Sequence, residues 1–266
     1  MTTNMTSSTL ADAINSLPSS GELPLPLPPV HLTTARYFTK IVANGFLSPQ
    51  NCKYFGEPIL YLFYGGVFYR PESSPTRHAI EFPVAFVFNP SVLDSVERFF
   101  PFDTGAIKSG RVGGWTDRLK PIDPRFKVDG RRESVAPEMV QYLFGSNANY
   151  LRGKINSDSV NKPDPFPLLH EYYSDDLTSL GVDHRQCVIE CQCLIDILLT
   201  RDLIWVGFPE TMTDEFAKLY LLTKPYMPDY YAYDCPVIFN PSEIAAILAD
   251  KAKEVIYRYV VLPGGD

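Results

Sequence analysis

Two polar side chains lie two positions apart in the otherwise apolar segment 187–194, and they are the strongest candidates for chemistry in this chain. In an extended strand, alternation sends Glu190 and Gln192 to one face and leaves the opposite face to Ile189, Cys191 and Cys193. A carboxylate among apolar neighbours either faces solvent or lines a cleft, because burial of an unpaired charge is costly. We expect Glu190 to lie in a cleft, where a carboxylate supplies preorganised negative charge.

A histidine and four further side chains form a second group of candidates. His31 lies in the first apolar segment, Tyr61 and Tyr64 lie in the second, and Tyr69 and Arg70 follow a pair of glycines. A single strand histidine is commonly a hydrogen-bonded structural residue, and strand tyrosines are commonly core residues with a hydroxyl at the wet edge. Flat aromatic faces equally suit a cationic ring. The residues alone leave both interpretations open.

The elements that must position these side chains can be read from periodicity and from turn residues. Strands scattered among helices, without regular alternation of strand and helix, predict an α+β fold. Asn44-Gly45 is a helix stop, and Asn89-Pro90 closes a strand. The predicted strands cover residues 29–32, 59–64, 82–88, 187–194 and 203–208, and the predicted helices cover residues 35–44, 91–98, 136–144, 214–222 and 242–258.

Composition favours a soluble globular protein. The 266 residues are 45% hydrophobic, 13% aromatic and 21% charged, so the chain can bury a sizeable core. The sequence lacks a run of about 18 apolar residues and a signal-peptide pattern at its start, so we expect a cytoplasmic protein with no membrane partner. The net charge of −7 argues against a general nucleic-acid coat protein, because sequence-independent binding depends on Lys and Arg.

The organisation along the chain is predicted to be a tail followed by one domain. Residues 1–26 are rich in Pro, Ser and Thr and are expected to be a disordered tail, followed by a single domain over residues 27–266. A basic loop insertion is expected over residues 104–134, since residues 108–132 hold eight basic and three acidic residues among several glycines and prolines. Such a loop is either a solvated surface segment or a contact for nucleic acid or another acceptor. Its candidate contact residues are Arg111, Arg118, Arg131 and Arg132.

Several enzyme classes are excluded by absent motifs. The chain has no Gly-x-Gly-x-x-Gly loop, no phosphate-binding P-loop and no Gly-x-Ser-x-Gly elbow. Its five cysteines are an odd number without the paired spacing of a zinc site, so we expect reduced thiols and no metal. Asp103 is interpreted as a turn former, in a segment, residues 102–105, that could line a site.

Three segments together resemble the ADP-ribosyltransferase superfamily, in its polymerase-like and diphtheria-toxin-like branch. They are Val30-His31-Leu-Thr-Thr34 running into a helix that ends Asn44-Gly45-Phe-Leu-Ser-Pro49, then Ile59-Leu-Tyr61-Leu-Phe-Tyr64, and then Asp183-His-Arg185-Gln-Cys-Val-Ile-Glu190-Cys-Gln192. The family has a His or Arg, an aromatic residue or Ser, and a late Glu in the same order. The resemblance implies a split two-sheet core with peripheral helices and NAD bound as a substrate in the cleft.

The resemblance also implies a role for each candidate. Glu190 would be the catalytic residue and would bind the 2′-hydroxyl of the nicotinamide ribose, His31 would bind a ribose hydroxyl, and Tyr61 or Tyr64 would stack on nicotinamide. Where the family usually has Gly after the histidine, this chain has Leu32, so the main-chain contact with the carboxamide would be altered or come from Thr33. The NAD-binding set is completed by Tyr69, Arg70 and Gln192.

Such a protein would move ADP-ribose from NAD to a protein or nucleic acid, as a bacterial toxin or an antiviral effector does. Three alternatives remain open: an NAD glycohydrolase, a non-catalytic module that binds a nucleotide or a partner in the same cleft, and an RNA 2′-phosphotransferase. If NAD is the ligand, His31, one of the two tyrosines and Glu190 must line a single cleft.

Overall fold

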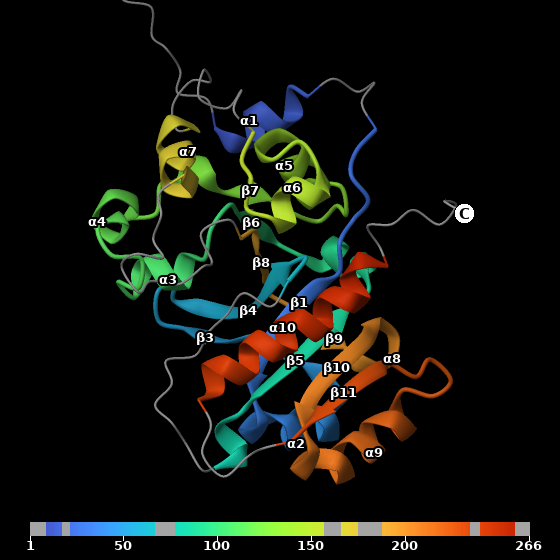
Figure 1. The fold of residues 1–266 in the computed structure, drawn as a ribbon. Coiled ribbons are helices and arrows are strands. Elements are labelled where there is room, and N and C mark those ends of the chain that lie inside the picture. Colours follow the sequence, from blue (N-terminus) through green and yellow to red (C-terminus); the bar gives the residue numbers. More distant parts are fainter. Residues whose placement is uncertain are drawn as a thin grey trace, which may run out of the picture.

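The computed structural model describes residues 9–17, 22–66, 78–156, 166–174, 188–234 and 240–258. Figure 1 shows one large sheet that crosses the molecule with helices packed around it, which confirms the predicted α+β class. Within these ranges, no helix is both long enough and apolar enough to span a bilayer.

Within the described part of the chain, the large sheet contains nine strands, and all but one of its neighbouring pairs are antiparallel. The exception is the parallel pair β10 and β11. Strand β3 pairs with β4 outside the main path. A separate two-stranded sheet joins β2 (Phe46–Leu47) to β9 (Ile197–Leu198). Across the large sheet the order is β11 (Asp229–Tyr233), β10 (Leu203–Pro209), β5 (Pro83–Phe88), β1 (Pro29–Thr34), β4 (Glu57–Tyr64), β8 (Glu190–Cys193), β6 (Arg98–Phe100) and β7 (Val128–Asp129). Strand β3 (Gln50–Cys52) pairs with the first residues of β4.

The sheet divides between its two central strands. β1 and β4 share only the pairs Pro29 with Tyr64 and Val30 with Phe63. Beyond Val30, β1 continues along β5 as far as Thr34, while β4 runs along β8. The two halves therefore separate after the second pair, which gives the split core predicted from the sequence.

Helix α2 (Ala35–Asn44) covers one half of the sheet and follows β1 directly. Its buried face includes Phe38, whose ring lies 5.7 Å from the ring of Phe208 on β10. The helix ends at Gly45, whose φ of 76° is the left-handed conformation that glycine adopts most easily. The predicted strand, helix and glycine stop are confirmed here.

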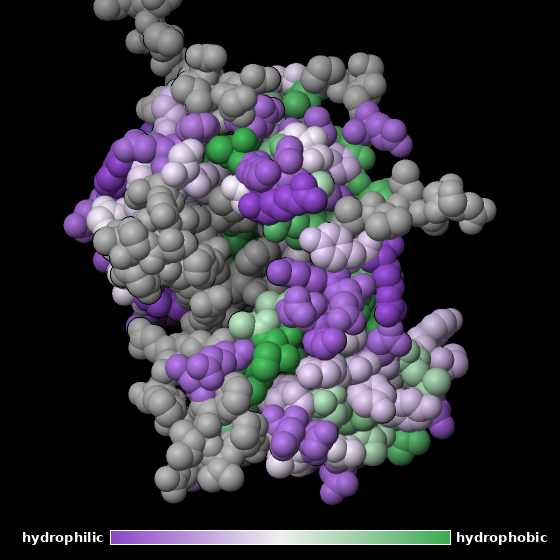
Figure 2. All heavy atoms as spheres, viewed as in Figure 1, coloured by the Kyte–Doolittle hydropathy of each residue, from purple (hydrophilic) through white to green (hydrophobic). Residues whose placement is uncertain are grey.

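Two further helices complete this half. α9 (Thr213–Leu222) packs against α2, and α10 (Pro241–Tyr257) packs across β5 and β10. Figure 2 shows mostly hydrophilic residues over the outward face of the C-terminal half of α10, as expected of a helix that buries one face only. Both helices agree with the predicted ranges.

The other half of the sheet is surrounded by short helices around an aromatic core. In that core, the ring of Phe102 lies 5.3 Å from Phe126, and Trp115 lies 5.3 Å from Tyr172. Apart from α1, the remaining helices among the described residues are α3 (Thr104–Lys108), α4 (Trp115–Leu119), α5 (Val135–Leu143), α6 (Asn147–Leu151), α7 (Phe166–Ser174), α8 (Leu199–Asp202) and the 3-10 helices η1 (Ala79–Glu81), η2 (Pro90–Ser95), η3 (Pro124–Phe126) and η6 (Glu210–Met212).

The basic segment 104–134 is not the irregular loop expected from the sequence. It contains α3, α4, η3 and β7, because Ile107, Trp115 and Phe126 are buried and anchor short helices between the glycines. The helix expected over residues 91–98 is shorter than predicted. It is the 3-10 helix η2 (Pro90–Ser95), after which Arg98 begins strand β6 beside β8.

The N-terminal region departs from the expected disordered tail. Residues 10–15 form helix α1 (Leu10–Asn15), which begins at a reciprocal cap between Thr9 and Asp12. Leu10 and Ile14, one helical turn apart, are buried where α1 packs on α5 and η3. Leu27 is buried as well. The apolar pair of α1 binds this segment to the domain.

Candidate functional site

A cavity of about 820 Å³ opens where β1 and β4 separate. Its volume lies in the range of about 300–1,000 Å³ that small-molecule and cofactor sites occupy. The cavity brings together His31 and Thr33 of β1, Tyr61 of β4, and Glu190 of β8. Residues about 160 positions apart in the chain therefore line one cavity, as the sequence analysis required.

His31 lies at the point where the two strands part. Its Nδ1 atom is 2.9 Å from the carbonyl oxygen of Tyr61. Because a carbonyl only accepts hydrogen bonds, Nδ1 carries the proton and the Nε2 atom of the neutral ring is an acceptor. Burial lowers the pKa of His31, and the bond to the Tyr61 carbonyl opposes this effect. The ring is therefore neutral at pH 7.

Glu190 lies at the inner wall of the cavity, fully buried and held by three donors. The Thr104 backbone N–H donates to Oε2 at 2.9 Å, and the Thr104 hydroxyl donates to Oε1 at 2.7 Å. Gln192 Nε2 also donates to Oε1, at 2.6 Å. A carboxylate has about four acceptor positions, so Oε2 retains capacity for a ligand hydroxyl.

The protonation of Glu190 is controlled by opposing effects. Burial raises its pKa to about 8, and the nearby Asp103 carboxylate contributes in the same direction. The hydrogen bonds from Thr104 and Gln192 favour the charged form and limit the rise. A positive charge brought into the cavity would favour ionisation of Glu190 further.

The two candidate tyrosines lie on opposite faces of the sheet. Tyr61 lines the cavity, and its hydroxyl is 2.9 Å from the Cys52 sulfur. Tyr64, three positions later, is fully buried in the core; its hydroxyl accepts a hydrogen bond from the Leu27 N–H. The sequence analysis named either Tyr61 or Tyr64 as the stacking partner for nicotinamide. Because Tyr64 lies on the face of the sheet opposite the cavity, Tyr61 is the candidate that remains.

The other predicted NAD-binding residues divide into three cases. Thr33 lines the cavity. Gln192 is fully buried behind Glu190 and contacts that carboxylate instead of the cavity. Tyr69 and Arg70 lie outside the described residues.

Sequence reasoning missed the residues that hold Glu190 in place. Thr104, 86 residues from Glu190 in the chain, reaches the carboxylate from the start of α3, and Arg98, 92 residues away, reaches Gln192 through the pairing of β6 with β8. Asp103 lines the cavity and also caps α3 through Oδ1, which accepts from the Ala106 N–H at 2.7 Å. The capping pattern was readable as a turn signal, but its place beside Glu190 was not.

The four arginines predicted to contact an acceptor have different environments. Arg111 lines the cavity. The other three form ion pairs with carboxylates of the same chain: Arg118 with Glu171, Arg131 with Glu97, and Arg132 with Glu138. The positive charge of segment 104–134 is thus largely accompanied by carboxylates of the same chain, and contact of these three exposed arginines with an acceptor stays a prediction.

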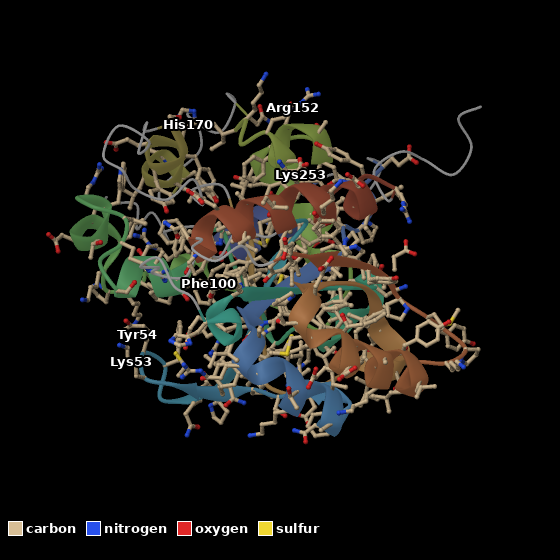
Figure 3. All side chains as sticks on the ribbon, turned by 60° about the horizontal axis from the view of Figure 1, so that its bottom comes forward. Lys53, Tyr54, Phe100, Arg152, His170 and Lys253 are labelled. Carbon is tan, nitrogen blue, oxygen red and sulfur yellow. The ribbon has the colours of Figure 1, made fainter. Side chains whose placement is uncertain are left out.

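The rim of the cavity carries other positive side chains. Lys40 of α2 and Lys53, in the turn between β3 and β4, line it together with Arg111. Figure 3 shows Lys53 and Tyr54 at this turn, on the side of the molecule where α3 lies. The Lys108 ammonium of α3 lies 5.1 Å from the Phe55 ring of the same turn, which links the turn to α3.

Over the described ranges, no three His, Cys, Asp or Glu side chains gather in a group that could hold a metal ion. Cys52, Cys191 and Cys193 are free thiols, and the last two are buried.

Comparison with known proteins found no matching family model and no matching curated protein. Among solved structures, the chain is similar to Thermus sp. 2.9 DarT in complex with NAD+, with a TM-score of 0.39 and 10% identity over 80% of this chain and 98% of the other. For Thermus sp. 2.9 DarT in complex with ADP-ribosylated ssDNA, the TM-score is 0.38 and the identity is 9%, over 80% of this chain and 97% of the other. The similarity is distant, so we infer function from the cavity of this chain.

Proposed function

We propose that this protein is an ADP-ribosyltransferase that cleaves NAD and transfers ADP-ribose to a macromolecule. The observation that carries the proposal is the buried Glu190 carboxyl, which three donors hold at the wall of a cavity shared with His31 and Tyr61. Once the bound cationic ring favours its ionisation, a carboxylate held in this way stabilises a positive charge that develops during a reaction.

The proposed reaction breaks the bond between C1′ of the nicotinamide ribose and the pyridinium nitrogen. The bonding electron pair moves to the nitrogen, so that neutral nicotinamide leaves and C1′ passes through an oxocarbenium-like state. A nucleophilic atom of the acceptor then bonds to C1′ and loses its proton to solvent. Glu190 would bind the ribose 2′-hydroxyl through Oε2 and stabilise the transient positive charge.

The remaining cavity residues suit the other parts of NAD. The neutral His31 ring offers Nε2 as an acceptor for a ribose hydroxyl. Tyr61 offers an aromatic face to the cationic nicotinamide ring, and the Thr33 side-chain hydroxyl would offer a polar contact to the carboxamide. Lys40 supplies positive charge for the diphosphate.

For the acceptor, we propose a nucleic acid that approaches over the rim formed by the β3–β4 turn and α3. Lys53, Lys108 and Arg111 place positive charge on this rim, and Tyr54 adds an aromatic side chain. This combination suits single-stranded nucleic acid, whose bases stack on aromatic rings while cations bind phosphates. Modification of nucleic acid in a target cell would be consistent with a toxin or antiviral role.

The proposal can be tested with NAD labelled separately in the nicotinamide and adenine moieties. The wild-type protein should release nicotinamide and transfer the adenine label to nucleic acid. The Glu190→Gln variant should lose release by at least about a hundredfold, a loss typical of removed electrostatic stabilisation. Glu171→Gln, a change at an exposed ion pair with Arg118, is the matched control and should behave as wild type.

The same experiment separates the alternatives. Release of nicotinamide with the adenine label left in free ADP-ribose would identify an NAD glycohydrolase. NAD binding without release would identify a binding module and contradict the proposal.

A further inference from the structure

A chain of side chains leads from the surface of the sheet to Glu190. Arg98 lies on β6 and pairs in register with Gln192 on β8, so the two side chains share one face of the sheet. The Arg98 Nε–H donates to Gln192 Oε1, and Gln192 Nε2 donates to Glu190 Oε1. We infer that Arg98 is a positioning residue for Glu190 that acts through the Gln192 amide, an inference that rests on the proposed function.

Arg98 determines which way the Gln192 amide points. A guanidinium group only donates hydrogen bonds, so the atom of Gln192 that faces it must be the carbonyl oxygen. The NH₂ group is then turned toward Glu190, and it also lies 3.3 Å from the Thr104 hydroxyl. In the flipped amide, a carbonyl oxygen would face the carboxylate and repel it.

The Gln192 side chain has no solvent to compensate for a wrong orientation, because it is fully buried. A buried polar group that loses its partner bears the full cost of its desolvation. By fixing the orientation of the Gln192 amide, Arg98 therefore also fixes the hydrogen bond that this amide donates to the Glu190 carboxylate.

Arg98 is itself held at its outer end. Its Nη2 group donates to Glu57 Oε1 at 2.5 Å, and the guanidinium carbon lies 4.9 Å from the centre of the Phe55 ring. The Arg98 side chain is only 16% exposed, whereas that of Glu57 is 36% exposed. A lysine cannot reproduce this arrangement, because its single ammonium group lacks the planar fork that contacts Gln192 and Glu57 together.

The charged and titratable groups around Glu190 come from four elements. Asp103 precedes α3, Tyr61 lies on β4, Cys191 lies beside Glu190 on β8, and Arg98 lies on β6. The Gln192 amide, whose NH₂ group Arg98 turns toward the carboxylate, favours the ionised form of Glu190, whereas Asp103 opposes it. Loss of Arg98 should therefore raise the pKa of Glu190.

A double-mutant cycle tests whether Arg98 acts through Gln192. Arg98→Met and Gln192→Leu should each lower kcat for nicotinamide release by about tenfold to a hundredfold, with KM for NAD changed by less than about threefold. The double variant should be no slower than the slower single variant, because both changes remove the same link. Losses that multiply would overturn the inference.

A second measurement does not require activity. The melting temperature, measured from pH 5 to pH 9, should fall in a step as Glu190 ionises in the folded protein. This step is assigned to Glu190 if it is missing from the Glu190→Gln variant. Arg98→Met should move this step to higher pH, and an unmoved step would overturn the inference. Arg258→Met, which removes a similar ion pair with Asp229 outside the cavity, is the control and should leave both kcat and the step unchanged.

These readouts distinguish failure of the positioning role from failure of the proposed function. If the wild-type protein releases no nicotinamide, the proposed function fails, and the pH step still decides whether Arg98 positions Glu190. If Arg98→Met does not fold, Arg98→Lys replaces it and should shift the step in the same direction by a smaller amount. An Arg98→Lys variant equal to wild type in both readouts would overturn the inference.

Discussion

The Nδ1 atom of His31 lies 2.9 Å from the carbonyl oxygen of Tyr61, at the place where β1 and β4 stop pairing as strands. In a continuous sheet, a backbone N–H of the neighbouring strand would occupy that carbonyl. The imidazole substitutes for the missing backbone donor, so the chain can open a cavity without leaving a buried carbonyl unpaired. The contact between His31 and Tyr61 therefore both stabilises the split of the sheet and places His31 in the candidate site.

The first prediction concerns His31→Phe. The aromatic ring is kept, but the Tyr61 carbonyl loses its donor, which should lower the free energy of unfolding by about 1–3 kcal/mol. NAD should bind more weakly by up to about tenfold, because one hydrogen bond to a ribose hydroxyl is lost. Urea denaturation and calorimetric titration with NAD measure the two effects. Unchanged NAD affinity in a folded variant would show that His31 is structural only.

The second prediction is the pH dependence of stability. The pKa of Glu190 is about 8 in the folded protein and near 4.5 when it is exposed in the unfolded chain. Between these values the folded state binds one more proton than the unfolded state, so the contribution of Glu190 to stability is greatest below pH 4.5 and falls as pH rises toward 8. Denaturation at intervals from pH 5 to pH 9 should show this fall, and Glu190→Gln should remove it. A wild-type curve that superimposes on that of the variant would contradict the raised pKa.

The third prediction links Glu190 to the ligand. NAD carries a cationic nicotinamide ring, which should favour the ionised carboxylate, so binding below pH 8 should release a proton. The affinity for NAD should therefore rise with pH up to about 8 and then level off. Calorimetry in two buffers of different ionisation enthalpy measures the released proton. Proton uptake, or an affinity independent of pH in this range, would place the nicotinamide ribose away from Glu190.

Periodicity in the sequence was sufficient to predict the elements that surround the cavity. The first strand, α2 and the Gly45 stop were predicted because their signals are local, and the same holds for β4, β5, β10, α9 and α10. The shared face of Glu190 and Gln192 followed from simple alternation. Local pattern and final structure agree at these positions because packing reinforces the intrinsic preference.

The missed elements depend on contacts between distant residues. Arg98 begins a strand only because β8 lies beside it, so residues 91–98 could be interpreted as a helix. Thr104 reaches Glu190 from a short helix that glycines appeared to exclude. The α1 helix had a local signal, the Thr9 and Asp12 cap, which the surrounding polar residues obscured.

The fourth prediction follows from the docking of α1. Leu10 is fully buried, so Leu10→Ala should lower the free energy of unfolding by about 2–5 kcal/mol, the usual cost of such a cavity. Thr9→Ala should cost about 1 kcal/mol through loss of the helix cap. Urea denaturation measures both changes. If Leu10→Ala were as stable as the wild type, α1 would contribute nothing to the domain.

The last prediction compares Lys53 and Arg111, which line the cavity, with Arg131 and Arg132, which do not. If nucleic acid is the acceptor, Lys53 and Arg111 should contact phosphates, since both line the cavity. Their joint replacement by Ala should weaken binding of single-stranded nucleic acid and reduce the slope of log K against log salt by roughly 1–1.5, because each lost contact with a single strand accounts for about 0.7. Arg131 and Arg132 are the matched control, since they form ion pairs with Glu97 and Glu138 and do not line the cavity. Titrations at several salt concentrations measure the slope for both pairs of replacements. If replacing Arg131 and Arg132 reduced the slope instead, the nucleic acid would bind away from the cavity, near these two arginines.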